Sequence, residues 1–561
     1  MSARTGARER AAFAALVALQ LVPVWAFGPF ATQDGATHLF NAVALAEWSD
    51  PARALLREVF AVSREPNPNW TAQLVLAALA RALDPDVAER VLVSAYVVGL
   101  PLALHALLRA LGHARPWLAL AAVPLAHGFA LGMGLYNFCL SVALWAWALA
   151  LYVRAAERGG VARFAAFGAA CVLLYFTHVV STLALAVTIG ALELAELARA
   201  PRAWRAQAAR VGRAAVAALP CALLVLWFAS SEGGPAGLVF AGRAVLVNVR
   251  NTFALVFFSA WGDQDVAPLA PMLFALALLA TSLDRRGARH PAARGLGIAA
   301  LALLALAVVM PSSSLAGEML TPRLVLYPVL LAAAWIGART PDADGAGGAG
   351  TGDAGRAGRA GDATGSAGPR PASLAGVALG LAALLAAAVA ALDQRAASAE
   401  LAAYHACDAA IPEGAVLLPL TFEPTARFAG VGSLYAPVDP FVHAGARSAL
   451  RRGAVNLDNH TAENGNHPLV WRAGFVPVRT IGCVECMPPV DLDLEAYPRP
   501  VDAVLLWKAP ASVPGALGRA LARDYALACG AEPGARTQLW VRRARGAREP
   551  AAVPRAPEGG A

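Results

Sequence analysis

Long apolar runs separated by short polar stretches dominate the sequence. A membrane-spanning helix needs about 20 apolar residues, and fewer where it packs inside a bundle. Eleven runs meet this criterion, at residues 11–30, 88–109, 115–133, 135–153, 163–178, 181–198, 212–230, 266–283, 296–311, 323–338 and 373–392. Residues 70–83 are apolar for only about 14 positions, so we expect this segment to lie in the membrane interface or to re-enter.

Arginine clusters fix the orientation of these spans. Loops on the cytoplasmic side of membrane proteins are enriched in Lys and Arg. With the amino terminus inside, the inner loops carry Arg109 and Arg115; Arg154, Arg158 and Arg163; Arg199, Arg202, Arg205, Arg210 and Arg213; Arg285, Arg286, Arg289 and Arg294; and Arg339, Arg356, Arg359 and Arg370. A full span at 70–83 would invert every later loop, so the interfacial interpretation is favoured. It places Asp34, and everything after residue 393, outside.

The composition agrees with an integral membrane protein. Of 561 residues, 58% are hydrophobic and 15% are charged, whereas soluble domains are roughly one-quarter charged. The net charge of +8 comes from clusters between apolar runs, which indicates topology and predicts no nucleic-acid partner. Arg4, Arg8 and Arg10 precede the first run as in a signal peptide, but no small-x-small cleavage pattern follows. We therefore expect a retained first span in the cytoplasmic membrane of a bacterium, with a bilayer as the surroundings of the protein.

The fold class expected is an α-helical polytopic membrane protein with a small extracytoplasmic α/β domain at its carboxy-terminal end. The predicted parts are a polytopic module at 1–338 with outer loops at 31–87 and 231–265, a flexible cytoplasmic linker at 339–372, a last span at 373–392, the α/β domain at 393–545 and a disordered tail at 546–561. In the second outer loop, 238–258 is a further interfacial stretch. Within the α/β domain we expect strands at 415–420, 501–507 and 538–542, and a helix at 517–528.

The cysteines divide between the two parts. Cys139, Cys171 and Cys221 lie in apolar spans, where small buried hydrophobes are expected. The outer cysteines are Cys407, Cys483, Cys486 and Cys529, which allow three pairings. An oxidising compartment favours disulfides. The Cys483-Val-Glu-Cys486 pair could be redox-active or bind zinc, but no second ligand pair has suitable spacing.

Asp34, directly after the first apolar run, is the strongest candidate for chemistry. A carboxylate that leaves a membrane span on one defined side is where a membrane enzyme would hold a base, and it could equally cap the following helix. Residues 36–48 are amphipathic, which predicts a helix lying on the membrane. His38 follows Asp34 by four residues and would share its helix face. Glu65 is the best second carboxylate, with a solvated loop residue as the alternative.

Residues from distant spans could complete a site. His178 lies at an outer turn between two spans, and Arg323 begins a later span after Thr321-Pro322. Both could donate to a phosphate, although a snorkelling role also suits an arginine here. Tyr136 and Asn137 follow a glycine-rich outer turn and could reach the site, whereas tight helix packing explains the glycines equally well. Asp263 and Asp265 are weaker candidates.

The layout resembles the membrane glycosyltransferases of the GT-C fold, which include aminoarabinose transferases and protein O-mannosyltransferases. The resemblance rests on Gln33-Asp34-Gly35 after span one and the amphipathic helix that follows it. It also rests on the Pro-rich segment Glu65-Pro66-Asn67-Pro68, a span ending in basic residues (107–115), an outer arginine before a proline-containing span (323–328) and a terminal outer domain. It covers most of residues 1–338.

The resemblance implies a polyprenyl-phosphate sugar as donor and an extracytoplasmic lipid, glycan or protein as acceptor. Asp34 would be the catalytic base of an inverting transfer, and Arg323, with His178, would hold the leaving phosphate. We expect no cofactor, and no motif calls for a divalent metal. The alternatives are a transporter, which would favour repeated halves that the sequence does not show, and a noncatalytic scaffold whose outer domain binds a partner.

Overall fold

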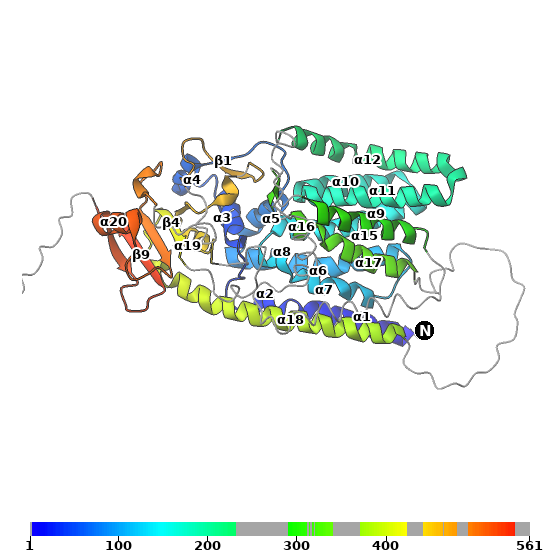
Figure 1. Cartoon of the computed structure of the whole chain (residues 1–561), viewed down its shortest axis with the longest axis horizontal. Helices are drawn as coiled ribbons and strands as arrows, with labels where there is room; N and C mark the ends of the chain where they lie inside the picture. The colour runs from blue at the N-terminus through cyan, green and yellow to red at the C-terminus, as the bar shows by residue number, and fades with distance from the viewer. Residues whose placement is uncertain are drawn as a thin grey trace, which may run out of the picture.

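A computed structural model shows a helical bundle joined end to end with a small mixed sheet (Figure 1). The structure describes residues 3–231, 290–310, 313–314, 317–318, 320–339, 371–422, 441–463, 465–478 and 492–544. The second outer loop, with Asp263 and Asp265, the linker, the tail, Cys483 and Cys486 therefore lie outside the described residues, as does the expected span at 266–283.

The bundle consists of long apolar helices. They are α6 (Pro85–Ala110), α9 (Tyr136–Arg158), α10 (Val161–Thr177), α11 (Val179–Arg199), α12 (Trp204–Ser231), α15 (Ala293–Val309), α17 (Leu326–Arg339) and α18 (Pro371–Tyr404). Within the described residues, five segments are long and apolar enough to cross a bilayer: 85–110, 136–158, 179–199, 201–231 and 375–410. The chain is thus a polytopic helical membrane protein.

Two of the expected spans are not single helices. The run 11–30 divides into α1 (Ala3–Leu19) and α2 (Val22–Trp25), and the run 115–133 divides into η2 (Trp117–Ala122), α7 (Val123–Ala126) and α8 (Phe129–Gly132). Pro23 and Pro124 stand in the first turns of α2 and α7. Proline is tolerated there but disrupts a helix interior, so each helix must restart.

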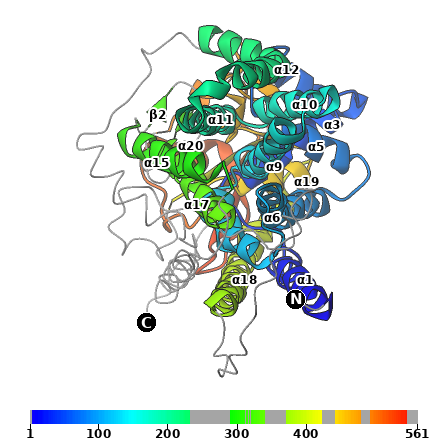
Figure 2. The ribbon, with the colours of Figure 1, turned by 90° about the vertical axis from the view of Figure 1, so that its right-hand side faces the viewer.

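Helix α18 links the two parts. It begins beside α1 at the far end of the bundle and runs along one side of it (Figures 1 and 2). It ends at the carboxy-terminal domain expected at 393–545, which we call the outer domain. It continues to Tyr404, twelve residues beyond the expected end of the span at 392. In this extension Gln394 exchanges two hydrogen bonds of 2.9 Å with the backbone of Ala31, and Ser398 accepts one from Gly28 N–H. The extension thereby holds the chain that leads to Asp34.

The outer domain is built on a five-stranded sheet in the order β5-β4-β7-β9-β8. Its strands are β4 (Val416–Thr421), β5 (Val455–Asn456), β7 (Ala503–Trp507), β8 (Tyr525–Cys529) and β9 (Thr537–Arg542). Strand β4 runs parallel to both β5 and β7, and β9 runs antiparallel to β7 and β8. The three strands expected from the sequence are present.

The last third of the helix expected at 517–528 is a strand instead. Helix α20 (Gly515–Asp524) ends at Asp524, and residues 525–529 form β8. Pairing with β9 satisfies the backbone of this segment and overrides its helical spacing. Cys529 in β8 forms a disulfide with Cys407 in η6 (His405–Ala410), which fixes one of the three possible pairings. Cys139, Cys171 and Cys221 are buried and free, as expected.

The first outer loop is part of the outer domain rather than a separate surface. It contains α3 (Gly35–Ala46), α4 (Ala54–Val59), β1 (Phe60–Val62) and α5 (Thr71–Ala80). Strand β1 pairs with β6 (Leu469–Trp471), and Phe40 and Phe60 share a hydrophobic core with the five-stranded sheet. The short helix expected at 70–83 is present as α5.

Helix α3 corrects the expectation of a helix lying on the membrane. Every residue from Gly35 to Ala44 is buried. One side of α3 packs on α5, and another packs on α19 (Gly445–Arg451) of the outer domain. The polar positions that suggested a wet face, such as Asn41, instead meet polar groups of the outer domain. The polar side chains of the amphipathic pattern therefore contact the outer domain instead of water or lipid headgroups.

Candidate functional site

Asp34 is held by a backbone pairing with the glycine-rich turn after α8. Gln33 N–H donates to Gly132 O and Asp34 N–H donates to Met133 O, both at 3.0 Å. Gly134 has φ +78°, and a Cβ there would lie 2.5 Å from Gly35 N. Only glycine combines this conformation with so close an approach. The glycines of the turn therefore allow it to hold Asp34. This favours a role in the site over tight helix packing as the reason for these glycines.

The carboxylate of Asp34 does not cap α3. Asp34 is the residue before the helix, but its side chain accepts no hydrogen bond from the first turn. The residue is 8% exposed, and its Oδ1 faces His443 Nε2 at 3.8 Å. Burial raises the pKa of Asp34 to about 6, against the opposing effects of His443, a hydrogen bond with Gln33 and the charge of Arg323. The group is thus a buried, relatively basic carboxylate that is mostly ionised at neutral pH.

A second carboxylate lies behind His443. His443 Nδ1 is 3.0 Å from Asp458 Oδ2, and Asp458 is 1% exposed. The ring of His443 therefore lies between two carboxylates, with Nδ1 against Asp458 and Nε2 facing Asp34. The arrangement is a line of carboxylate, imidazole and carboxylate that crosses from the bundle into the outer domain.

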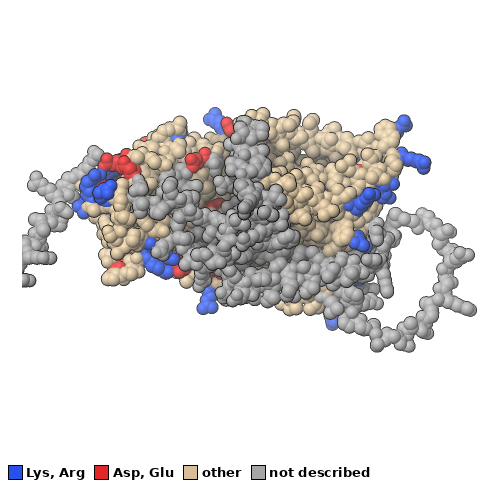
Figure 3. All heavy atoms as spheres, viewed as in Figure 1, with Lys and Arg blue, Asp and Glu red and all other residues tan. Residues whose placement is uncertain are grey.

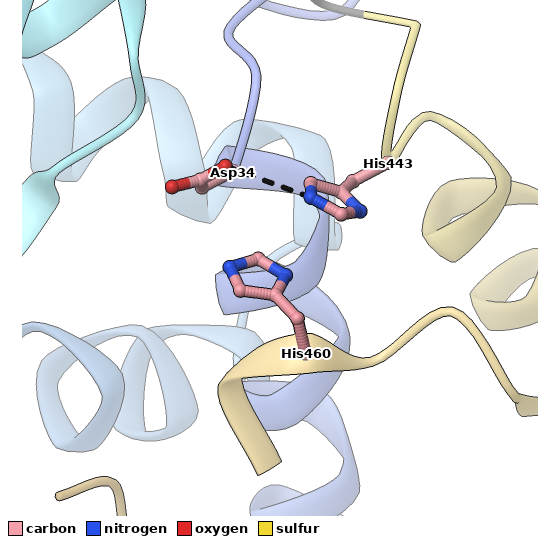
Figure 4. A group of neighbouring side chains, drawn as sticks. All are labelled: Asp34, His443 and His460. Atoms are coloured by element: carbon pink, nitrogen blue, oxygen red, sulfur yellow. Dashed lines mark ion pairs between the residues drawn. The ribbon is translucent and has the colours of Figure 1, made fainter. Parts of the chain in front are cut away.

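His460 joins this line from the side (Figure 4). Its ring stacks on that of His443 with centroids 4.2 Å apart, and one ligand atom of each of Asp34, His443 and His460 lies within 4.8 Å of the others. Burial, followed by the neighbouring histidines, lowers the pKa of His460 well below its usual value. The imidazole is therefore neutral. These three residues are the group that could hold a metal ion.

The fold explains why these side chains converge. Strand β4, helix α19 and strand β5 form a parallel crossover. His443 follows β4 along the chain, and Asp458 and His460 follow β5. The carboxyl ends of parallel strands meet at one edge of a sheet, where α/β proteins place their ligand sites. This edge faces the second turn of α3, because Asn41 donates to Thr461 Oγ1 at 2.6 Å and accepts from Asn459 Nδ2 at 2.7 Å.

Arg323 and His178, the two residues expected to hold a phosphate, contact each other. Arg323, from α16 (Leu320–Leu324), places Nη1 3.3 Å from His178 Nε2. Val180 N–H donates to His178 Nδ1 at 3.2 Å. Burial, followed by the charge of Arg323, lowers the pKa of His178 well below its usual value. Because a guanidinium only donates, His178 Nε2 accepts from Arg323 in one neutral tautomer, and Nδ1 accepts from Val180 N–H in the other.

The other candidates take different places. His38 is buried, and Gln73 Nε2 bridges its Nδ1, at 3.3 Å, to Nδ1 of His467, at 3.2 Å. Burial lowers the pKa of His38 to about 3. Glu65 is exposed and accepts a hydrogen bond of 3.2 Å from Asn67, so the carboxylate linked to Asp34 is Asp458 rather than Glu65.

Tyr136 and Asn137 act in the framework around the site. Tyr136 OH donates to Glu89 at 2.7 Å and lies 3.1 Å from Thr32 Oγ1, beside the backbone of Gly35. Asn137 accepts from Ala72 N–H at 2.7 Å and donates to Asn69 O at 2.8 Å, which anchors the start of α5. Both side chains are buried.

The sequence reasoning missed His443, Asp458, His460 and His467. These residues are separated from Asp34 by more than 400 positions, so local patterns could not connect them. One signal was available. Residues 456–467 combine asparagine, aspartate and two histidines between a strand and the segment that pairs with the first outer loop. A run of ligand-type side chains after a strand is typical of a functional loop.

Comparisons with known proteins show a general likeness in structure but none in sequence. No family model and no curated protein matches the chain. Among solved structures, the chain is similar to the arabinofuranosyltransferase AftD from Mycobacteria, with a TM-score of 0.46 and 15% identity. The similarity covers 97% of this chain and 40% of that one, so this chain spans less than half the length of AftD. We therefore infer function from the geometry of the site.

Proposed function

We propose that the chain is a membrane glycosyltransferase that transfers a sugar from a polyprenyl-phosphate donor to an extracytoplasmic acceptor. The observation that carries this proposal is that the charge of Arg323, which contacts His178, acts on the carboxylate of Asp34. A buried carboxylate of raised pKa, a half-buried arginine and a buried histidine thus come together from distant segments of the chain.

The arrangement of Arg323 and His178 suits a phosphate. Arg323 Nη1 lies 3.3 Å from His178 Nε2, so a guanidinium and an imidazole stand side by side. Phosphate oxygens are strong acceptors that pair well with guanidinium, and a neutral imidazole can donate one further hydrogen bond to them. The ring of Phe138 lies under Arg323, 5.8 Å from its guanidinium carbon, and supports it by a cation–π contact.

The reaction follows from these roles. Asp34 takes the proton of an acceptor hydroxyl, whose oxygen attacks the anomeric carbon from the face opposite the phosphate. The bond between that carbon and the phosphate oxygen breaks, and its electron pair leaves with the polyprenyl phosphate. Arg323 compensates the negative charge that develops there. The configuration at the anomeric carbon inverts, and Asp34 later returns its proton to water.

The test is sugar transfer by Asp34→Asn protein. The amide keeps the size of the side chain but cannot accept a proton, so we expect transfer from a polyprenyl-phosphate donor to fall about 10²- to 10⁴-fold. Glu65→Gln is the matched control, because Glu65 is an exposed carboxylate of the same loop, and it should retain parental activity. Parental rates in Asp34→Asn protein with the same elution profile would refute the base assignment.

Lipid bound to the purified protein separates this proposal from the other classes. Mass spectrometry of extracted lipid should find a polyprenyl phosphate or its sugar-linked form. If the protein were a transporter or a noncatalytic scaffold, we would expect neither this bound lipid nor its loss in Arg323 variants. Preparations that never contain a polyprenyl species would count against the donor class.

A further inference from the structure

We propose that Asp34, His443 and His460 bind a divalent transition-metal ion of the Zn²⁺ type between the bundle and the outer domain. One ligand atom from each residue lies within 4.8 Å of the other two. The ligands come from three segments, the start of α3 and the loops after β4 and β5. The proposal concerns a bound ion, so metal binding tests it independently of sugar transfer.

The donor set and its spacing fit such an ion. Imidazole nitrogen and carboxylate oxygen are zinc ligands at about 2.0–2.2 Å, so neighbouring ligand atoms on a tetrahedral ion lie roughly 3.4 Å apart. Asp34 Oδ1 and His443 Nε2 are 3.8 Å apart. Closing this distance requires a shift of only about half an ångström, which side-chain rotation can supply.

Asp458 gives His443 the orientation of a metal ligand. Metal-binding histidines commonly donate their second ring N–H to a carboxylate, which fixes the tautomer and makes the ligating nitrogen more basic. His443 Nδ1 lies 3.0 Å from Asp458 Oδ2, and its Nε2 faces Asp34. Asp458 is itself held by its backbone, because its N–H donates to Asn456 Oδ1 and its carbonyl accepts from Asn456 Nδ2.

His460 is positioned as the third ligand. The hydrogen bonds that Asn41 makes with Thr461 and Asn459 lock the loop around it onto α3. Its Nδ1 is buried and has no hydrogen-bond partner in the described part of the chain. A buried polar atom without a partner is costly, and a bound ion would supply an interaction that the protein otherwise lacks.

Three protein ligands leave one position of a tetrahedral ion open. Such open sites are typical of catalytic zinc, where the ion lowers the pKa of a bound water or hydroxyl. The second oxygen of Asp34 points away from His443 (Figure 4). Asp34 can therefore ligate through one oxygen and present the other to a hydroxyl held at the open position.

The experiment measures metal on the full-length protein in detergent, after dialysis against a chelator and then ZnCl₂. The Cys483-Val-Glu-Cys486 pair is a competing thiol site, so all proteins carry Cys483→Ser and Cys486→Ser. We expect one Zn²⁺ per chain by mass spectrometry of the metal. Co²⁺ in its place should show the visible absorption of a four-coordinate ion.

Variants locate the ion. His460→Ala should abolish stoichiometric binding, and Asp458→Asn should weaken Zn²⁺ about 10- to 100-fold in competition with a chromophoric chelator, since Asp458 acts through His443. His290→Asn is the matched control, because His290 pairs with Glu157 far from the site, and it should bind Zn²⁺ as its parent does. The proposal would be overturned if the parent did not bind Zn²⁺, or if the His460→Ala and Asp34→Asn proteins bound it as tightly as the parent does. His443 would then lie between two carboxylates without an ion. Metal binding without sugar transfer would overturn the proposed function alone.

Discussion

The chemistry of Asp34 is set by what surrounds it rather than by its own sequence context. Residues 33–38 allowed a helix cap or a catalytic base, because both use an aspartate before a helix. The structure separates them: the carboxylate accepts no bond from the helix start and faces an imidazole inside a buried junction. The pairing with the turn at Gly132 to Gly134 then makes the position of Asp34 independent of capping.

Arg323 provides the sharpest test of the phosphate end of the site. Lysine keeps the charge of arginine but loses the planar fork and its contact with Phe138. We expect Arg323→Lys to raise the KM for a polyprenyl-phosphate sugar about tenfold, which corresponds to about 1.4 kcal/mol, with a smaller change in kcat. Steady-state transfer assays at varied donor concentration measure this split.

The control for Arg323→Lys is Arg339→Lys at the opposite end of the bundle. Arg339 also lies over an aromatic ring, that of Trp335, 4.5 Å from its centroid. This variant should leave KM unchanged, since Arg339 does not contact the site. An equal rise in both variants would point to a general loss of helix packing.

Asp408 should make the outer domain sensitive to acid. Burial raises the pKa of its carboxyl, but hydrogen bonds from His405, Ser448 and Arg451 outweigh burial, so the pKa falls below the usual 3.8. His405 itself also faces the charge of Arg447. A carboxyl with a lowered folded-state pKa adds stability above its unfolded value and loses it as pH falls through the folded value.

Asp408→Asn should therefore destabilise the protein at neutral pH by about 1.5–3 kcal/mol, the typical contribution of hydrogen bonds to a charged group. This difference from the parent should stay constant from pH 7 to about 5 and shrink below about 4, as the parental carboxyl becomes protonated. Denaturant unfolding at each pH measures it. Glu413→Gln, whose side chain is 81% exposed, should change little at any pH, and a pH-independent Asp408→Asn deficit would contradict the assignment.

At the scale of elements, the sequence predicted where helices and strands occur better than where they end. Long apolar runs located α9, α10 and α11, short apolar runs located β4 and β7, whose residues are all buried, and alternating apolar positions located β9. The predicted boundaries were wrong where contacts with other segments determine where an element ends. Residues 525–529 became β8 by pairing with β9, and α18 continued to Tyr404 because its end packs on the chain before Asp34.

The contact between α6 and α19 is a buried ion cluster that sequence reasoning could not find. Arg447 on α19 donates to Asp86 and Glu89 of α6 and, at 3.0 Å, to Phe30 O. Glu89 is fully buried, and Tyr136 donates to its other oxygen. The cluster fastens the outer domain to the bundle next to Asp34. Arg447 lies 358 positions from Glu89 and 361 from Asp86 in sequence, so no local pattern connects it to them.

Replacing Arg447 alone should destabilise the protein more than replacing both Arg447 and Glu89. Arg447→Met leaves the carboxylate of Glu89 buried without its cation, which costs about 3–5 kcal/mol. In Arg447→Met/Glu89→Leu protein the uncompensated charge is gone, so stability should recover by at least about 1 kcal/mol. Thermal unfolding of the purified proteins gives the double-mutant cycle. A double variant no more stable than Arg447→Met would show that packing, rather than charge, holds α19.

At the scale of the whole molecule, the site exists only because two parts of the chain interlock. The first outer loop adds β1 to β6 and contributes Phe40 and Phe60 to the core of the outer domain. In return, the outer domain supplies His443, Asp458 and His460 to Asp34. The sequence predicted each part and the presence of Asp34, His178 and Arg323 on one side of the membrane. It could not predict the interlocking, which depends on tertiary packing between segments far apart in the chain.

The same arrangement predicts which end of the molecule faces the cytoplasm. Arginine side chains lie at the end of the bundle away from the outer domain, whereas both basic and acidic side chains are visible over the opposite half (Figure 3). Because cytoplasmic loops are enriched in positive charge, we predict that Asp34 lies outside. With Cys483 and Cys486 replaced by serine, a membrane-impermeant maleimide should label Glu413→Cys in right-side-out vesicles and Arg158→Cys only after they are opened. The remaining free thiols are buried and should not react. The reverse labelling pattern would put the whole site in the cytoplasm, where polyprenyl-linked sugars would have to be used before, rather than after, they cross the membrane.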